Sequence, residues 1–94
     1  PMTRDELIAE IEERYPDAEI ILADGFEDAF VGIAERCASP HVAIYDYGRM
    51  VDVLVKRDGM TEEEADEFLQ FNVLGAYVGE GTPWYLTHRA GEKP

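Results

Sequence analysis

The chain has 94 residues, 46% of them hydrophobic, and a formal net charge of −13 at pH 7 from 21 acidic and 8 basic side chains. This length and apolar content predict one folded domain and argue against disorder, and the single Cys37 excludes an internal disulfide. The acid surplus argues against direct binding to nucleic acid or to an anionic membrane, because phosphate contacts need Lys and Arg.

The first predicted element is a helix that begins with a capping box and ends before Pro16. Thr3 and Glu6 form the Thr-x-x-Glu pattern, in which each side chain bonds to the backbone N–H of the other residue. Apolar residues at positions 7, 8, 11 and 15 then recur with helical spacing. The residue before a proline is pushed out of helical geometry, so we expect the helix to stop at Tyr15.

Three short apolar runs follow and predict three strands. The first is Glu19 to Ala23, which the turn signal Asp24-Gly25 ends. The second, Ala29 to Ala34, is apolar on both faces, which predicts a central strand, and Gly32 within it predicts a bulge. The third is His41 to Tyr45, and the short connections between the runs predict an antiparallel meander.

Two further helices are predicted after the strands. Asp46 is placed to cap a helix from about Tyr47 to Arg57, which Gly59 ends. A second Thr-x-x-Glu capping box, at residues 61–64, starts a helix that we expect to reach about Val78.

The predicted fold class is α+β: a small antiparallel sheet of three to four strands with three helices packed on one face, in the order αβββααβ. The last strand is expected at Trp84 to Thr87, and residues 91–94 are expected to fray. We expect residues 1–94 to form one compact domain. Because Met2 follows Pro1, we also expect Met2 to be the natural first residue.

The stretch from Phe71 to Tyr85, FNVLGAYVGEGTPWY, is apolar on nearly every face of its helical part. Such a helix is expected to be buried on every face, against its own core or against a partner. We expect Asn72 to be a buried amide that bonds a neighbouring loop and clamps the helix to the sheet. Gly75 and Gly79 fall on one predicted helix face, where they allow either close intramolecular packing or a homodimer seam.

Two surfaces are candidates for binding. In the first, aromatic side chains can stack a nucleotide base and an amide can read its edge; its residues are Tyr45, Asp46, Tyr47, Asn72, Tyr77 and Trp84. The second is an acidic surface that suits a basic partner or imitates DNA phosphates, although the same side chains also serve as a solubility coat. Its residues are Glu10, Glu13, Asp24, Glu27, Asp28, Glu62, Glu63, Asp66 and Glu67.

The sequence contains no recognisable catalytic or metal-binding pattern. Cys37 and His41 form the closest approach to one, but no second pair completes a metal site and no third residue is placed to orient a nucleophile and its base. The glycine-containing stretch at residues 79–83 follows a helix and lacks Lys, which is the wrong polarity for a phosphate loop. We therefore expect a protein that is not an enzyme and that needs no cofactor or metal.

Several segments carry a resemblance. The most specific are Tyr45-Asp46-Tyr47 before a helix, MTEEEA at a helix start and FNVLGAYVGEGTP. Together with DGFEDAFVGIAERC, they resemble a family of small uncharacterised proteins of tailed bacteriophages. The resemblance implies a phage gene product in the cytoplasm of a bacterial host, and it implies no activity. A cytoplasmic protein also fits the lack of a membrane-span-length apolar run and of a signal-peptide core.

Three function hypotheses remain open. The first is a small acidic phage accessory protein that binds and modulates or inhibits a host protein with a basic surface, such as a defence or nucleic-acid-handling factor, with imitation of DNA as one mode. The alternative is a small-molecule or nucleotide-binding protein, either a sponge or an enzyme, with a site near Tyr45–Tyr47 and Asn72. A structural or virion-associated role is the third.

Overall fold

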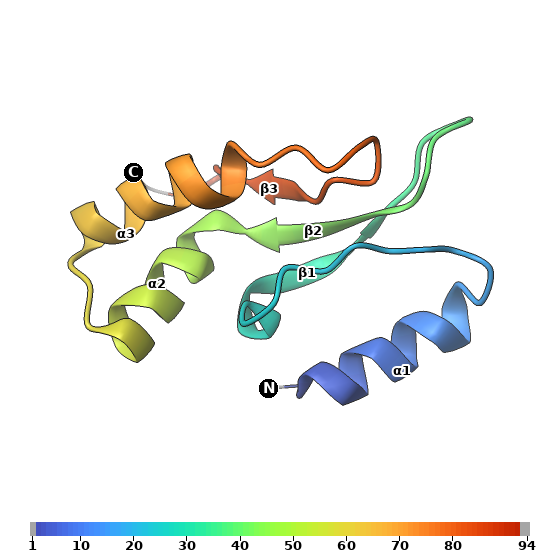
Figure 1. The fold of residues 1–94 in the computed structure, drawn as a ribbon, viewed down its shortest axis with the longest axis horizontal. Coiled ribbons are helices and arrows are strands. Elements are labelled where there is room, and N and C mark those ends of the chain that lie inside the picture. Colours follow the sequence, from blue (N-terminus) through green and yellow to red (C-terminus); the bar gives the residue numbers. More distant parts are fainter. Residues whose placement is uncertain (1, 93–94) are drawn as a thin grey trace.

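The computed structural model describes residues 2–92, which form three α-helices, a three-stranded sheet and two short helical turns (Figure 1). In chain order these are α1 (Arg4–Arg14), η1 (Glu27–Ala29), β1 (Phe30–Ala34), β2 (Val42–Asp46), α2 (Tyr47–Asp58), α3 (Glu62–Leu69), the π-helical turn η2 (Gln70–Leu74) and β3 (Trp84–Leu86). Pro1, and Lys93 and Pro94 in the expected frayed end, lie outside the described residues. The α+β class is confirmed, in the order αββααβ.

The helices begin and end largely where the local signals predict. Both capping boxes form, at Thr3 for α1 and at Thr61 for α3. Asp46 caps α2 by accepting a hydrogen bond from the backbone N–H of Arg49, with 3.1 Å between N and Oδ1. Gly59 ends α2 in the left-handed conformation, with φ at 70°, where an L side chain is strained.

The sheet is mixed, so the prediction of a purely antiparallel sheet is wrong. β1 pairs antiparallel with β2, whereas β2 pairs parallel with β3. The chain leaves β2 through α2 and α3 and returns through a long loop, so that β3 enters the sheet in the same direction as β2 (Figure 1). β1 lies at one edge of this sheet and not at its centre, but the bulge predicted at Gly32 is confirmed as a shift of register between Phe30 and Gly32.

The strand predicted from Glu19 to Ala23 does not form. Figure 1 shows this segment crossing in front of β1 without becoming a strand. Ile20 and Leu22 pack against the core from this position. The backbone N–H of Ala23 donates a hydrogen bond to the hydroxyl of Tyr45, so a side chain provides the contact that a neighbouring strand would have made.

The core is formed by buried side chains of β2, α2 and α3 together with those of η1 and the residue before it. Its largest fully buried side chains include Tyr45, Met50, Leu54 and Leu69. Figure 1 places α1 and α3 at opposite sides of the molecule, so the three helices do not share one face as predicted. Within residues 2–92, no helix has both the length and the apolar content needed to cross a membrane.

The last helix is shorter than predicted, and it does not reach Val78. After α3 the chain makes the π-helical turn η2, which Gly75 ends, and Gly79 then adopts a φ of 102° in a turn. Gly75 and Gly79 therefore do not share a helix face, so the continuous helix on which a homodimer seam is predicted does not form. A Cβ added at Gly75 would lie 3.1 Å from the carbonyl oxygen of Gln70, so a contact within the chain explains this glycine.

Candidate functional site

Tyr45, the first residue of the candidate nucleotide site, lies in the core. Its ring meets Phe30 edge-on at 5.7 Å between centroids and stacks on Tyr85 at 6.3 Å. Burial raises the pKa of Tyr45 above the usual value for tyrosine, although the hydrogen bond from Ala23 opposes that shift. A side chain held in this way organises the fold and presents no surface to a ligand.

Asp46 links the start of α2 to the C-terminal part of the chain. Its Oδ1 caps the helix, and its Oδ2 accepts from Nη2 of Arg89 at 2.7 Å. Burial alone pushes the pKa of Asp46 upward, but the hydrogen bonds from Arg89 and from the Arg49 N–H outweigh it, so the pKa lies below its usual value. Both carboxylate oxygens are therefore engaged inside the chain.

Tyr47 joins α2 to α3. Its hydroxyl donates to the carboxylate of Asp66 and accepts from Nε2 of Gln70 at 3.3 Å. Partial burial and the hydrogen bond to Asp66 both raise the pKa of Tyr47. One residue of the predicted acidic surface is thus tied to one residue of the predicted nucleotide site, in a contact between two helices.

Asn72 is not the buried clamp that the sequence predicts. It is exposed, and its Nδ2 donates to the carbonyl oxygen of Phe68, one turn back on its own helix, at 3.1 Å. Because the amide of Asn72 makes a hydrogen bond within its own helical segment and is exposed to solvent, it needs no hydrogen-bond partner in a neighbouring loop. The expectation of burial failed because apolar neighbours in sequence surround Asn72 without covering it.

Of the six residues in the candidate nucleotide site, only Tyr77 and Trp84 are brought together around a hollow. Both line a cavity of about 200 Å³, which also has Arg36, Glu35 and Glu80 on its wall. The other four residues lie in the core, at the helix cap, between α2 and α3, and on η2. The site as predicted does not exist as one cavity.

The predicted acidic surface is divided between distant parts of the molecule. Glu10 and Glu13 are exposed on α1, and Glu62, Glu63 and Glu67 are exposed on α3. Because α1 and α3 lie at opposite sides of the molecule (Figure 1), these two groups do not form one patch. The acids of α3 make the denser group.

The acids after the first predicted strand have separate roles. Asp24 forms an ion pair with Arg4, which joins the start of α1 to the loop before η1. Asp28 is exposed, whereas Glu27 is half-buried and its Oε2 has no hydrogen-bond partner among the described residues. Within residues 2–92, no group of three or more His, Cys, Asp or Glu side chains is placed to hold a metal ion.

Basic side chains gather on α2, a grouping that the sequence reasoning missed. Arg49, Lys56 and Arg57 line an open hollow of about 510 Å³ together with Asp28 and Asp52. Arg49 and Lys56 are seven residues apart in the predicted helix, and this spacing was the signal that places them on one face. The hollow therefore mixes both signs of charge on an otherwise acidic molecule.

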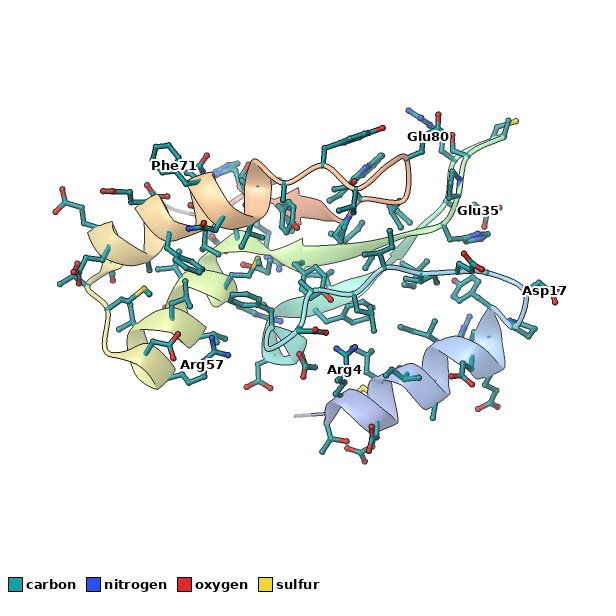
Figure 2. All side chains as sticks on the ribbon, in the orientation of Figure 1. Arg4, Asp17, Glu35, Arg57, Phe71 and Glu80 are labelled. Carbon is teal, nitrogen blue, oxygen red and sulfur yellow. The ribbon has the colours of Figure 1, made fainter. Side chains whose placement is uncertain are left out.

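The greatest departure from the sequence prediction is the exposure of large apolar side chains from the end of α3 onward. Large hydrophobic side chains along residues 68–84 face solvent; we call them the aromatic strip, and they are Phe68, Phe71, Tyr77, Val78 and Trp84. Phe71 is 79% exposed, Tyr77 76% and Trp84 50%. Figure 2 shows Phe71 pointing away from the ribbon on the outer side of α3.

Helical spacing explains why Phe71 is exposed. The buried residues Ala65 and Leu69 lie four apart on the inner face of α3. Phe71 follows Leu69 by two positions, which at 3.6 residues per turn directs it to the opposite side. Val73 and Leu74 of η2 pack against the core, whereas Phe71 lies on the side that faces away from it.

Comparison of the chain with known proteins adds no relative to this picture. No protein-family model, curated protein or solved structure matches it.

Proposed function

We propose that this chain is a small acidic accessory protein that binds a protein with a basic surface and modulates it, without catalysing a reaction. The proposal places it in the cytoplasm of a bacterial host, as a phage product acting on a host factor such as a defence or nucleic-acid-handling protein. The support for a phage origin is the resemblance of residues 24–37, 45–47, 60–65 and 71–83 to phage proteins.

The observation that carries this proposal is the surplus of unpaired acid at the surface. Only five of the 21 acidic side chains form an ion pair with another residue among residues 2–92. Glu62, Glu63 and Glu67 are exposed on one short helix and take part in none of these pairs. Such a surface attracts and orients a partner of opposite charge and repels anionic ones.

The proposal is tested by affinity purification from bacterial lysate at about 0.05 M and about 0.5 M NaCl, because added salt shortens the range of attraction between exposed charges. We expect one or a few basic proteins to co-purify at low salt and to be recovered in clearly smaller amounts at high salt. Mass spectrometry identifies them, and each is then purified and titrated against the chain. If no protein is enriched at low salt, or if the enriched protein is indifferent to salt, the proposal fails.

A matched pair of variants assigns the charge to a surface. The α3 variant removes three charges through Glu62→Gln, Glu63→Gln and Glu67→Gln. The α1 variant also removes three charges, through Glu10→Gln, Glu12→Gln and Glu13→Gln. We expect the α3 variant to lose affinity and the α1 variant to bind nearly as the wild type does. Equal losses would mean that net charge alone, and not the α3 surface, attracts the partner.

The hollow beside Tyr77 and Trp84 favours a second candidate function, the binding of a nucleotide. Tyr77, Trp84 and Arg36 are among its lining residues, and residues of these types suit a base and a phosphate. Its volume of about 200 Å³ is below the ~300 Å³ typical of ligand pockets. A thermal-shift screen with mononucleotides and cyclic nucleotides tests it, since a bound ligand raises the apparent stability; no shift at millimolar ligand would reject it.

A further inference from the structure

The aromatic strip has the composition and exposure of a protein-binding surface. Aromatic side chains dominate the binding energy of interfaces, and exposed apolar residues concentrated on one segment mark interaction sites. The strip holds Phe71, Tyr77 and Trp84, the three most exposed aromatic side chains of residues 2–92 that the core leaves uncovered. Five of the eight large hydrophobic residues that are exposed lie within residues 68–84.

Two hollows lie along the strip, so its surface is not flat. Phe68 and Phe71 line an open hollow of about 480 Å³, together with Met60. Tyr77 and Trp84 line the smaller cavity of about 200 Å³ near β3. In Figure 2, Phe71 and Glu80 mark the same outer side of the molecule, along α3 and the loop that leads to β3. An apolar partner side chain can therefore enter at either end.

Acidic side chains border both hollows. Glu64 and Glu67 lie beside Phe68 and Phe71, and Glu35 and Glu80 lie beside Tyr77 and Trp84. Arg36 is the one base on these two walls. The side chains at the edge of a partner that covers the strip therefore lie next to these carboxylates. Carboxylates attract Lys and Arg and repel Asp and Glu.

The same charges disfavour a second copy of the chain as the partner that covers the strip. A symmetric dimer would place this acid-bordered surface against itself and would bring together two chains of −13 each. A net charge so far from zero keeps proteins apart. An anionic membrane surface is disfavoured for the same reason.

We infer that the aromatic strip is the docking surface for a protein segment that carries apolar side chains flanked by Lys or Arg, such as a basic amphipathic helix. This inference rests on the proposed function and names the place where the basic partner binds. The acids of α3 attract the segment, and Phe71, Tyr77 and Trp84 bury its apolar face. The apolar contact gives the complex affinity that added salt does not remove.

The probe is a synthetic amphipathic helix built from Leu and Lys, compared with two matched peptides. One replaces Lys with Glu, which keeps the apolar face and reverses the charge, and the other replaces Leu with Ser, which keeps the charge and removes the apolar face. Binding is measured by calorimetry at about 0.05 M and about 0.5 M NaCl. We expect only the Leu/Lys peptide to bind at the higher salt concentration.

Two variants of unchanged net charge locate the contact. Phe71→Ser with Tyr77→Ser removes two exposed rings of the strip, and Val31→Ser with Ile21→Ser removes two apolar side chains that are 45% and 39% exposed elsewhere. We expect the strip variant to weaken binding of the Leu/Lys peptide by about tenfold or more, and the control variant to change it by less than about twofold. Thermal unfolding checks that both variants fold; if the strip variant does not, Phe71→Ala alone takes its place.

The outcomes separate this inference from the proposed function. Suppose that the variant with Gln at positions 62, 63 and 67 loses affinity while the strip variant does not. The proposed function would then be supported, but the strip would not be the place where the partner binds. Equal binding of the Leu/Lys and Ser/Lys peptides would likewise overturn the inference, because charge alone would then suffice. Binding of the Leu/Glu peptide, or dimerisation of the free protein that the strip variant abolishes, would assign the strip to another occupant.

Discussion

The backbone N–H of Ala23 donates a hydrogen bond to the hydroxyl of Tyr45, 2.8 Å away, and so fixes a segment without regular structure to the centre of the sheet. Tyr45 is buried, and the segment before Ala23 contributes Ile20 and Leu22 to the core. We expect Tyr45→Phe to lower the free energy of unfolding by about 1–2 kcal/mol, because it leaves the Ala23 N–H without its partner. Urea unfolding followed by circular dichroism measures this loss.

Tyr85→Phe is the matched control, since Tyr85 stacks on Tyr45 but is only half-buried. Its effect should stay within about 0.5 kcal/mol. Equal effects of the two substitutions would show that the Ala23 contact does not stabilise the fold.

The raised pKa of Tyr45 predicts a loss of stability in alkali. Burial is the main cause of the shift, so the folded protein holds the phenol proton more tightly than the unfolded chain does. The contribution is fully present below the unfolded pKa of about 10 and is lost as the pH rises through the folded pKa. The urea midpoint of the wild type should therefore fall more steeply above about pH 10 than that of Tyr45→Phe. Parallel profiles would contradict the assignment.

Local signals in the sequence predicted the helix starts, while contacts distant in sequence decided the sheet. The capping boxes at Thr3 and Thr61 act within a single turn, so the residues that form them are enough to recognise them. The segment before Ala23 has the composition of a strand, but its partner is a side chain 22 residues away. No local pattern encodes that partner, nor the parallel entry of β3 beside β2.

The same limit explains the misplaced site residues. Hydrophobic composition indicates that Phe71, Tyr77 and Trp84 are costly to leave in water. Composition does not indicate whether these side chains are buried by the same chain or by a partner. The apolar pattern leaves both possibilities open for the helix, but it predicts that Asn72, which is exposed, lies in the interior.

Asp46 provides a test that separates capping from charge. Asp46→Ala removes the acceptor for the Arg49 N–H and should destabilise the protein by about 1 kcal/mol. Asp46→Asn keeps a capping oxygen and loses only the charged contact with Arg89, so it should cost less. The pKa of Asp46 is lowered on folding, so its charge contributes above the unfolded pKa of about 4, and the contribution is lost as the pH falls through the folded pKa. The gap between wild type and Asp46→Asn should therefore close in acid, and a gap that persists there would refute the charge effect.

The glycine near the start of α2 and the glycine that ends this helix should respond to alanine in opposite directions. Gly59 has a φ of 70° at the end of the helix, and Gly59→Ala should cost about 1 kcal/mol because of backbone strain alone. Gly48 lies in the first turn of the same helix, where an added Cβ meets only Asp46 Oδ1 at 3.4 Å. Gly48→Ala should be neutral or stabilise by up to about 1 kcal/mol. Thermal unfolding of the two variants measures the change in stability. A change of the same sign in both variants would be inconsistent with this geometry.

The two sides of α3 should differ sharply in their tolerance of substitution. Leu69 is fully buried, so Leu69→Ala should cost about 2–5 kcal/mol by leaving a cavity in the core. Phe71 is 79% exposed, so Phe71→Ala should change stability by less than about 0.5 kcal/mol. Chemical denaturation of both variants measures the difference. A large loss from Phe71→Ala would mean that the chain buries this ring.

The most direct test of the central claim, that the aromatic strip is an open docking surface for a basic apolar segment, uses the fluorescence of Trp84, the only tryptophan in the chain. Acrylamide should quench Trp84 readily in the free protein, since half of its surface is exposed. Saturation with the Leu/Lys peptide should shift the emission to shorter wavelength and protect Trp84 from quenching, while the Ser/Lys peptide should do neither. Strong protection of Trp84 in the free protein, or emission that the Leu/Lys peptide leaves unchanged, would contradict the claim.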